Sequence, residues 1–215
     1  MFLKRLSSLT MVAAVVIAVS NSSTPAWCWD ATKQEKNLVL LKQIEAELVK
    51  TPGDLDLQIR HMQALGVAHR RQDQLKEAET LISKHPHLRE AFKGKMFAFI
   101  GLRNWTGAMT AMEQVEKLGP LSSAELTIRG SIFAGLEQYP EALVDLNEAI
   151  SRDSSDAGAY FTRAECLYKL HGPTAEVVHS LEKTLKLEPD FPNAKILLDS
   201  MNASLKSGES TAKAQ

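Results

Sequence analysis

The sequence has few of the residues that would point to a disulfide framework, a nucleic-acid partner or a β-sheet. Two cysteines among 215 residues make no disulfide framework. Basic and acidic residues nearly balance, at 25 against 26, and nucleic-acid binding needs a clustered positive excess. No run of alternating β-branched residues predicts a strand. We therefore expect an all-α chain with no nucleic-acid partner.

The motifs of common enzyme classes are also missing. The chain has no glycine-rich phosphate loop after a predicted strand, no Gly-x-Ser-x-Gly motif and no His-Glu-x-x-His motif. Cys166 has apolar neighbours and no nearby histidine, which favours a small core residue over a nucleophile. His85 and His87 form the one tight histidine pair, and most zinc sites need three or four ligands. We expect no enzymatic activity, no cofactor and no metal site.

The first 26 residues have the order of a secretory signal peptide. Lys4 and Arg5 precede an apolar or small stretch, 6–19, and polar residues follow it. We expect cleavage after Ala26, with cleavage after Ser20 as the alternative. The apolar run is shorter than the about 20 residues of a membrane-spanning helix. The mature protein is thus expected in the periplasm or outside the cell without a membrane span, and an uncleaved N-terminal anchor is the alternative interpretation.

Cys28 follows the predicted signal peptide. A lipoprotein cysteine needs a small residue immediately before it, and Trp27 occupies that place. A disulfide between Cys28 and Cys166 would require an oxidising compartment. We expect Cys28 to be a free or mixed-disulfide thiol.

A 34-residue period runs through the rest of the chain. Pro52, Pro86 and Pro120 are equally spaced at this period, Ser154 is next in step, and Pro189 comes one residue late. Each intervening segment reads as an apolar-periodic helix, a short turn and a second apolar-periodic helix. One hairpin cannot bury its apolar side alone, so successive hairpins must stack.

Segment 123–156 shows the repeated pattern most completely. Large and small packing residues fall at repeat positions 4, 8, 11, 17, 20, 24 and 27, as Leu126, Gly130, Phe133, Tyr139, Ala142, Leu146 and Ala149. Small residues allow two helices to pack closely, and bulky residues fill the space between hairpins. This pattern resembles the tetratricopeptide-repeat (TPR) family. The resemblance implies a right-handed superhelical array of antiparallel helix pairs, an α-solenoid of about four repeats with flanking cap helices.

We interpret 55–191 as the repeat array, divided into 55–88, 89–122, 123–156 and 157–191. The last of these contains one inserted residue near Gly172. Segment 55–88 matches the family only after a four-residue shift that places Leu65 at position 7 and Ala78 at position 20. The shift predicts a long first helix and a short second helix there.

The two ends of the array are expected to carry cap helices, because terminal repeats need a cover with one polar face. Residues 27–54 are interpreted as a linker followed by an amphipathic helix that begins at Gln34 and ends at Lys50. Residues 192–207 are interpreted as a C-terminal cap helix. The small polar segment 208–215 is expected to be disordered.

The resemblance also implies a concave peptide-binding groove. In the resembled family, positions 2, 5, 9, 12 and 13 of each first helix face the bound peptide. Carried onto this chain, they are Arg60, Gln63, Val67, Lys93, Phe97, Ile100, Thr127, Ser131, Ala134, Phe161, Glu165 and Tyr168. The centre of this set is apolar and aromatic, which suits a helical or extended peptide with hydrophobic anchors.

Co-chaperone members of the family bind a C-terminal carboxylate with lysine, asparagine and arginine at set positions. Lys93 matches that pattern, whereas the other positions carry Phe97, Ile128, Gly158 and Thr162. A carboxylate clamp is therefore not expected. The sequence favours an exported, non-enzymatic scaffold that binds a protein or peptide for assembly, secretion or envelope maintenance. A self-associating architectural module and an accessory subunit of an envelope enzyme are the alternatives.

Overall fold

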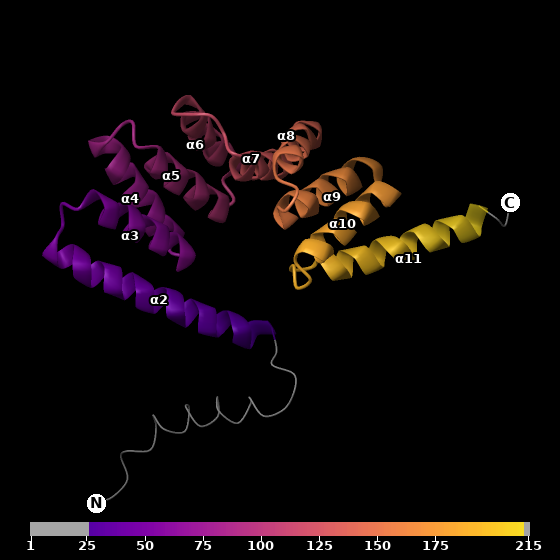
Figure 1. Cartoon of the computed structure of the whole chain (residues 1–215), viewed down its shortest axis with the longest axis horizontal. Helices are drawn as coiled ribbons and strands as arrows, with labels where there is room; N and C mark the ends of the chain where they lie inside the picture. The colour runs from indigo at the N-terminus through magenta and orange to yellow at the C-terminus, as the bar shows by residue number, and fades with distance from the viewer. Residues whose placement is uncertain (1–25, 213–215) are drawn as a thin grey trace, which may run out of the picture. The chain divides into compact units, whose positions relative to one another are not determined.

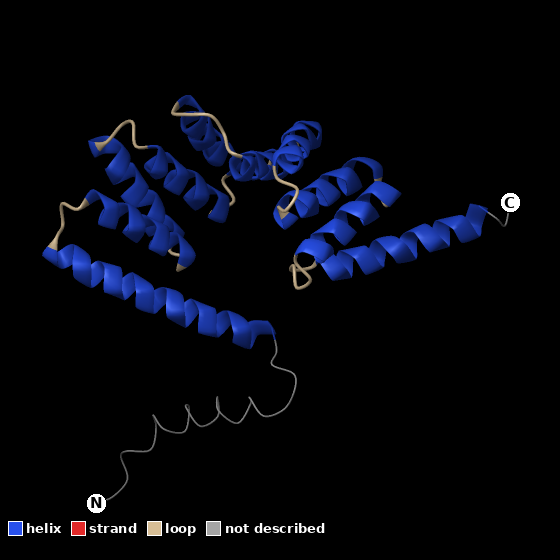
Figure 2. Cartoon of the chain, viewed as in Figure 1, coloured by secondary structure: helices blue, strands red, loops and turns tan. Residues whose placement is uncertain are grey.

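The structure is a computed structural model that describes the backbone of residues 26–212 and the side chains of 34–204. Every regular element in that range is an α-helix (Figure 2), which confirms the all-α prediction. The helices are α2 (Ala26–Lys50), α3 (Leu55–Val67), α4 (Arg71–Lys84), α5 (Arg89–Gly101), α6 (Trp105–Lys117), α7 (Ser123–Gly135), α8 (Tyr139–Arg152), α9 (Ala157–His171), α10 (Ala175–Leu187) and α11 (Ala194–Ala212). The signal peptide predicted over residues 1–26 lies outside the described residues except for Ala26.

The helix starts follow the 34-residue period of the sequence. The first helices of the four predicted repeats begin at Leu55, Arg89, Ser123 and Ala157, in step with that period throughout. The second helices α4, α6 and α8 keep the same spacing, and α10 begins two residues late, after the turn at Gly172. Polar N-caps help to set the first helices, since the side chains of Asp54, Ser122 and Asp156 each accept a backbone N–H of the first turn.

The four-residue shift expected in segment 55–88 is wrong. Helix α3 has 13 residues and α4 has 14, so the first helix is not long and the second is not short. Leu65 and Ala78 are both buried at the unshifted positions 11 and 24. The sequence pattern favours the shifted frame because this repeat departs from the others at two positions. Position 24 is the small residue Ala78, where later repeats have a larger residue, and position 20 is the buried Gln74, where they have alanine or valine.

The described part of the chain divides into two compact units, unit 1 up to His69 and unit 2 from Arg70 onward. In unit 1, α2 packs on α3 through an apolar cluster that includes Leu41, Ile44, Leu57 and Leu65. Helix α2 begins at Ala26, eight residues before the expected start at Gln34.

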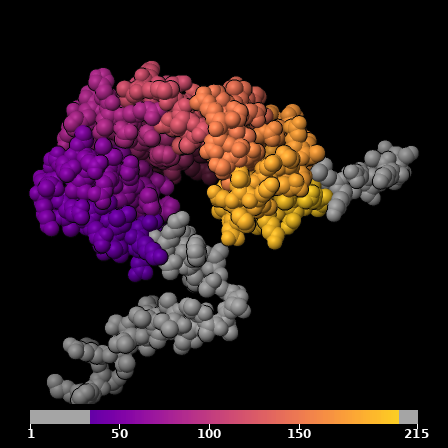
Figure 3. Space-filling model, viewed as in Figure 1, coloured from indigo at the N-terminus to yellow at the C-terminus, as the bar shows by residue number. Residues whose placement is uncertain are grey.

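Unit 2 is a stack of antiparallel helix pairs (Figure 1). Helix α4 packs on α5, the pairs α5–α6, α7–α8 and α9–α10 follow in order, and α11 packs on α10. Figure 3 shows that side chains fill the spaces that the ribbons leave between neighbouring helices of this unit. The α-solenoid of antiparallel helix pairs is therefore confirmed.

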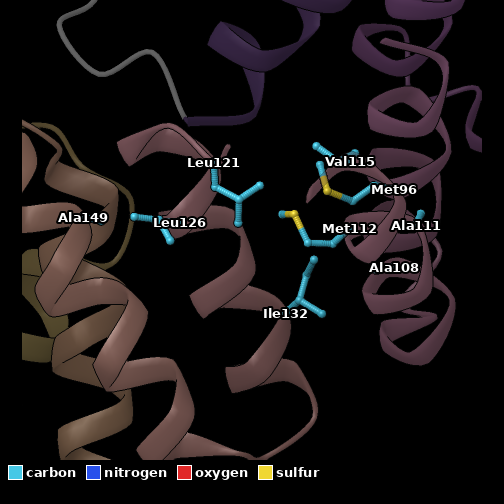
Figure 4. Close-up of a cluster of buried hydrophobic side chains, with 9 residues drawn as sticks. All are labelled: Met96, Ala108, Ala111, Met112, Val115, Leu121, Leu126, Ile132 and Ala149. Carbon is cyan, nitrogen blue, oxygen red and sulfur yellow. The ribbon is translucent and has the colours of Figure 1, made fainter. Parts of the chain in front are cut away.

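The core of unit 2 lies between successive pairs. One buried cluster joins α5–α6 to α7–α8 and includes Met96, Met112, Leu126 and Ile132 (Figure 4). The close packing expected at the small residues Gly130 and Ala142 is present, since a Cβ added to Gly130 would lie 3.3 Å from the Ala142 carbonyl oxygen. The small residue at position 8 thus allows α7 and α8 to approach closely.

The C-terminal helix is longer than expected. α11 continues to Ala212, whereas the sequence pattern placed the helix end at 207 and a disordered tail from 208. Residues 213–215 of that predicted tail lie outside the described residues. Over the described part of the chain, no helix is both long and apolar enough to cross a membrane.

Candidate functional site

The candidate groove residues of unit 2 lie on α5, α7 and α9. Helices α7 and α9 are in contact, and ion pairs from α5 to Glu125 link α5 to α7. We use the name α5–α7–α9 face for the nine predicted positions in this unit. They are Lys93, Phe97, Ile100, Thr127, Ser131, Ala134, Phe161, Glu165 and Tyr168.

The three remaining candidates belong to α3 in unit 1. Arg60, Gln63 and Val67 are all exposed. In the unshifted frame, Gln63 and Val67 occupy positions 9 and 13, which the resemblance assigns to the groove, and Arg60 occupies position 6. The resemblance therefore no longer assigns Arg60 to the groove, whereas it still assigns Gln63 and Val67 to it.

Two aromatic side chains of the α5–α7–α9 face are open to solvent. Phe97 is 39% exposed and Tyr168 is 38% exposed. Phe161 is half-buried, and its ring centroid lies 4.8 Å from that of Phe191. Ile100 packs against the core cluster of α5–α8 and so is only partly available. Phe97 and Tyr168 are thus the large apolar side chains of this face that a partner can reach most easily.

The two hydroxyl groups of the face already have internal partners. Thr127 Oγ1 donates a hydrogen bond to Asp156 Oδ2 at 2.7 Å, and Asp156 is the N-cap of α9. Ser131 Oγ donates to the Thr127 carbonyl oxygen at 2.9 Å. Thr127 therefore links α7 to the start of α9, and each hydroxyl oxygen can still accept a hydrogen bond from a ligand.

Lys93 is part of an ion-pair cluster that the sequence did not predict. Its Nζ lies 3.3 Å from Glu125 Oε1, and Arg89 Nη1 lies 2.9 Å from the same oxygen. The backbone N–H of Ser122 donates to Glu125 Oε2 at 2.9 Å, and its hydroxyl donates to Oε2 at 3.0 Å. The Glu125 side chain is only 6% exposed.

The Glu125 cluster strongly favours the charged carboxylate. Burial alone would raise the pKa of Glu125, but the hydrogen bonds from Ser122, Arg89 and Lys93 outweigh it and lower the pKa from 4.5 to about 2. Glu125 therefore pairs with Arg89 and Lys93 together, and these three side chains keep one net positive charge between them. Glu125 also completes a capping box with Ser122, so the same carboxylate stabilises the start of α7.

Basic residues recur in the sequence at repeat position 7. Position 7 of each first helix is basic, and each of these side chains has a polar partner on a neighbouring helix: His61, Lys95, Arg129 and Arg163. Arg129 donates two hydrogen bonds to buried Asp145, at 2.7 and 2.8 Å, and this pairing raises the pKa of Arg129. The recurrence of basic residues at the repeat period was the sequence signal for this row.

Glu165 differs from Glu125 in its electrostatic surroundings. Partial removal of its carboxylate from water raises the pKa of Glu165, and the positive charge of Lys169 opposes that shift. Both side chains are exposed on α9. This end of the face therefore presents a carboxylate without a strong cationic partner beside the aromatic ring of Tyr168.

The residues considered for catalysis or metal binding lie apart from the face. Cys166 is a buried free thiol, and burial raises its pKa to about 11, which confirms its prediction as a core residue. His85 and His87 are both exposed in the loop after α4. Within residues 34–204, no three His, Cys, Asp or Glu side chains come together as a possible metal site.

Sequence comparison finds similarity to Hsp70-Hsp90 organizing proteins of plants. The chain is 32% identical over 146 residues to the Hsp70-Hsp90 organizing protein of Triticum aestivum, an alignment that covers 68% of this chain and 21% of the relative. It is 38% identical over 80 residues to Hsp70-Hsp90 organizing protein 3 of Arabidopsis thaliana, covering 37% of this chain and 14% of that protein. The chain thus spans about a fifth or less of the length of these curated relatives. No family model matches the chain.

Structural comparison shows the same fold. A thermophilic TPR protein of Thermus thermophilus aligns with a TM-score of 0.64 at 16% identity, over 76% of this chain and 89% of that one. YrrB, described as a TPR protein with an unusual peptide-binding site, aligns with a TM-score of 0.57 at 16% identity, over 76% and 84%. The first TPR domain of Spaghetti (RPAP3), bound to an HSP90 peptide, aligns with a TM-score of 0.50 at 22% identity, over 55% and 93%. The repeats and these comparisons confirm the predicted resemblance to the tetratricopeptide-repeat family and show that the chain has its fold.

Proposed function

We propose that this chain is an exported, non-enzymatic scaffold whose α5–α7–α9 face binds a partner protein through a segment rich in apolar and aromatic side chains. The observation that carries the proposal is the exposure of Phe97 and Tyr168 on this face. Exposed aromatic side chains supply much of the binding energy at protein interfaces. The partner serves assembly, secretion or maintenance of the cell envelope.

The charge of the face supports a partner segment that is apolar rather than acidic. Lys93 is held in an ion pair with Glu125, and the hydroxyl of Thr127 donates a hydrogen bond to Asp156. Glu165 adds a carboxylate at the α9 end, which disfavours an acidic ligand there. Spaghetti and YrrB support peptide binding as a general property of the fold, and each was described with its own peptide or peptide-binding site.

Quantitative affinity capture from the compartment of the native protein tests this function. The mature chain is compared with Phe97→Ala/Tyr168→Ala and with the control Val144→Ala, which removes an exposed apolar side chain of α8, outside the face. We expect a partner that is enriched by the wild type and the control and depleted at least tenfold with the double variant. Equal enrichment by all three chains would reject the face as the binding surface.

Export is proposed from the charged and apolar N-terminal pattern of residues 4–26. Cell fractionation followed by mass spectrometry of the mature N-terminus tests it. We expect a chain that begins after Ala26 or after Ser20 and is recovered outside the cytoplasm. Recovery of the uncut chain from the cytoplasm would contradict export, and recovery from membranes would favour the N-terminal anchor.

Self-association through the terminal helices is the second candidate function. Helix α2 exposes Leu38, Val39 and Leu40 in succession, and α11 exposes Ile196. Exposed apolar residues grouped in this way can mark a protein interface. Size-exclusion chromatography with light scattering separates the two functions, because the scaffold is expected to be a monomer or weak dimer and the architectural module a stable oligomer.

A further inference from the structure

The ion-pair cluster at the start of α7 has the composition of a carboxylate-binding site. Arg89 and Lys93 from α5, the backbone N–H and the hydroxyl of Ser122, and the positive end of the α7 dipole all converge on one carboxylate. That carboxylate is the side chain of Glu125. We name the set Arg89, Lys93 and Ser122 the carboxylate cradle.

We propose that Glu125 is an internal ligand of the carboxylate cradle and, by occupying it, determines the specificity of the α5–α7–α9 face against acidic partner segments. The proposal deepens the proposed function, and its consequence for partner choice rests on it. Lys93 belongs to the face and is 34% exposed, so an external carboxylate could approach it. In the native chain, such a carboxylate would have to displace Glu125 or approach its negative charge.

Displacement of Glu125 by a partner is unfavourable for two reasons. The Glu125 side chain is part of the same chain as the cradle, so it competes with a free ligand at a high effective concentration. Its removal would also break the capping box of α7. Arg89 is further fixed by hydrogen bonds from Nε to the Val115 carbonyl and from Nη2 to the Pro120 carbonyl, at 3.1 and 3.2 Å. Arg89 is therefore held in place by groups other than Glu125.

Replacement of Glu125 by a smaller residue should make the cradle available to an external carboxylate. The probe is formate, and the full chain is compared in sodium formate and in sodium chloride of equal ionic strength. We expect formate to raise the Tm of Glu125→Ala in a saturable manner, with no corresponding rise for the wild type or for Glu125→Gln, whose amide still fills the space. Removal of one cation in Glu125→Ala/Lys93→Met should reduce the rise by at least half.

Equal responses to formate and chloride, or an equal rise for Glu125→Gln, would overturn the proposal. If Glu125→Ala does not fold in either salt, the acetylation rate of Lys93 in Glu125→Gln decides, measured by peptide mass spectrometry. Loss of the carboxylate should release Lys93 and increase its acetylation several-fold. Lys95, which is paired with Glu79 at 3.0 Å, is the control within the same helix and should not change. An unchanged rate at Lys93 would contradict the proposal.

Specificity is tested separately with two forms of one apolar peptide, a free C-terminal acid and its amide. The wild type should bind both forms equally, and Glu125→Ala should prefer the acid by about tenfold. Equal binding of both forms by Glu125→Ala would refute the specificity role even if formate binds. The wild type could fail to bind either form while formate still raises the Tm of Glu125→Ala. That outcome would count against the proposed function and would still support Glu125 as the internal ligand of the cradle.

Discussion

The two halves of unit 2 share one repeat period but stabilise their helix pairs with different polar groups. In α5–α8, Arg129 binds the buried carboxylate of Asp145. In α9–α11, Arg163 occupies the same repeat position and donates instead to the hydroxyl of Ser180, at 2.7 Å, and to Asn147 Oδ1, at 2.8 Å. An arginine at this repeat position is therefore paired with a carboxylate in the first half and with neutral oxygen atoms in the second.

This difference has a consequence for the α5–α7–α9 face. In the first half, the charges close to the face are paired internally, as Lys93 is with Glu125. In the second half, Glu165 and Lys169 remain exposed beside Tyr168. The cation of the first part is thus held in an internal ion pair, whereas the second part carries exposed charges that can influence the choice of partner.

The largest expected effect comes from removing the arginine in each half. Arg129→Ala leaves the Asp145 carboxylate buried without its partner and should lower the free energy of unfolding by about 3–5 kcal/mol. Arg163→Ala removes hydrogen bonds to neutral groups and should cost about 1 kcal/mol. Urea unfolding followed by circular dichroism measures both. Equal losses of unfolding free energy in Arg129→Ala and Arg163→Ala would contradict the difference between a charged and a neutral arginine partner.

The next largest difference between the halves should appear in the dependence of the unfolding free energy on pH. The pKa of Glu125 is depressed from 4.5 to about 2, so its contribution is complete above pH 4.5 and is lost as the pH falls toward 2, to a total of about 3 kcal/mol. Unfolding free energies of the wild type and Glu125→Gln at pH 7 to 2.5 should converge over this range.

Glu165 provides the comparison of opposite sign. Its pKa is raised, so the folded chain favours the protonated acid, and a falling pH relieves a small destabilisation. As the pH falls, the free energy of unfolding of the wild type should therefore rise relative to that of Glu165→Gln, whereas it falls relative to that of Glu125→Gln. A difference that shifts in the same direction as that of Glu125→Gln would contradict the assignment.

Substitutions at the close contacts within the helix pairs should give a smaller difference in stability between the halves. Gly130→Ala would place a Cβ 2.8 Å from Leu146 Cγ and should cost about 1–3 kcal/mol. Ala164 occupies the equivalent position in the next repeat and is fully buried without such a conflict, so Ala164→Gly should cost about 1 kcal/mol by adding backbone entropy to the unfolded chain. Thermal unfolding compares the two, and a stabilising Gly130→Ala would refute the close approach of α7 and α8.

The turns within the helix pairs give the smallest effect. Arg103 and Glu137 have φ of 57° and 62° in the first half, where the equivalent turn of the second half uses Gly172 at 73°. Arg103→Gly and Glu137→Gly should each stabilise the chain by up to about 1 kcal/mol, and Gly172→Ala should destabilise it by about the same amount. Chemical denaturation of the three variants checks the signs, which should be opposite between the halves.

The sequence predicted the features that depend on residues within one helix pair. The spacing of Gly130 and Ala142 predicted their close packing, and the apolar neighbours of Cys166 predicted its burial. The frame of α3 and α4 was misjudged because Leu65-Gly66 and Ala78 suit the family pattern at more than one register. Packing selects among such registers, and the sequence pattern alone does not contain that information.

The polar network could not be predicted because its partners lie far apart in the chain. Glu125 is 36 residues from Arg89, and Asp145 is 16 residues from Arg129. The repeat position of Lys93 predicts its place on the face, and only the structure shows that it is paired with Glu125. Periodicity identifies positions on a helix, whereas the charge presented by those positions depends on which side chains the fold brings together.

The central claim is that a partner segment binds on the α5–α7–α9 face, and site-specific photo-crosslinking tests it most directly. A benzophenone amino acid is placed at Phe97, at Tyr168 or, as the control, at Val144 on α8, which is 67% exposed. The proposed function predicts that one partner crosslinks from positions 97 and 168 and not from 144. Crosslinking of that partner from 144, with none from 97 or 168, would contradict the claim.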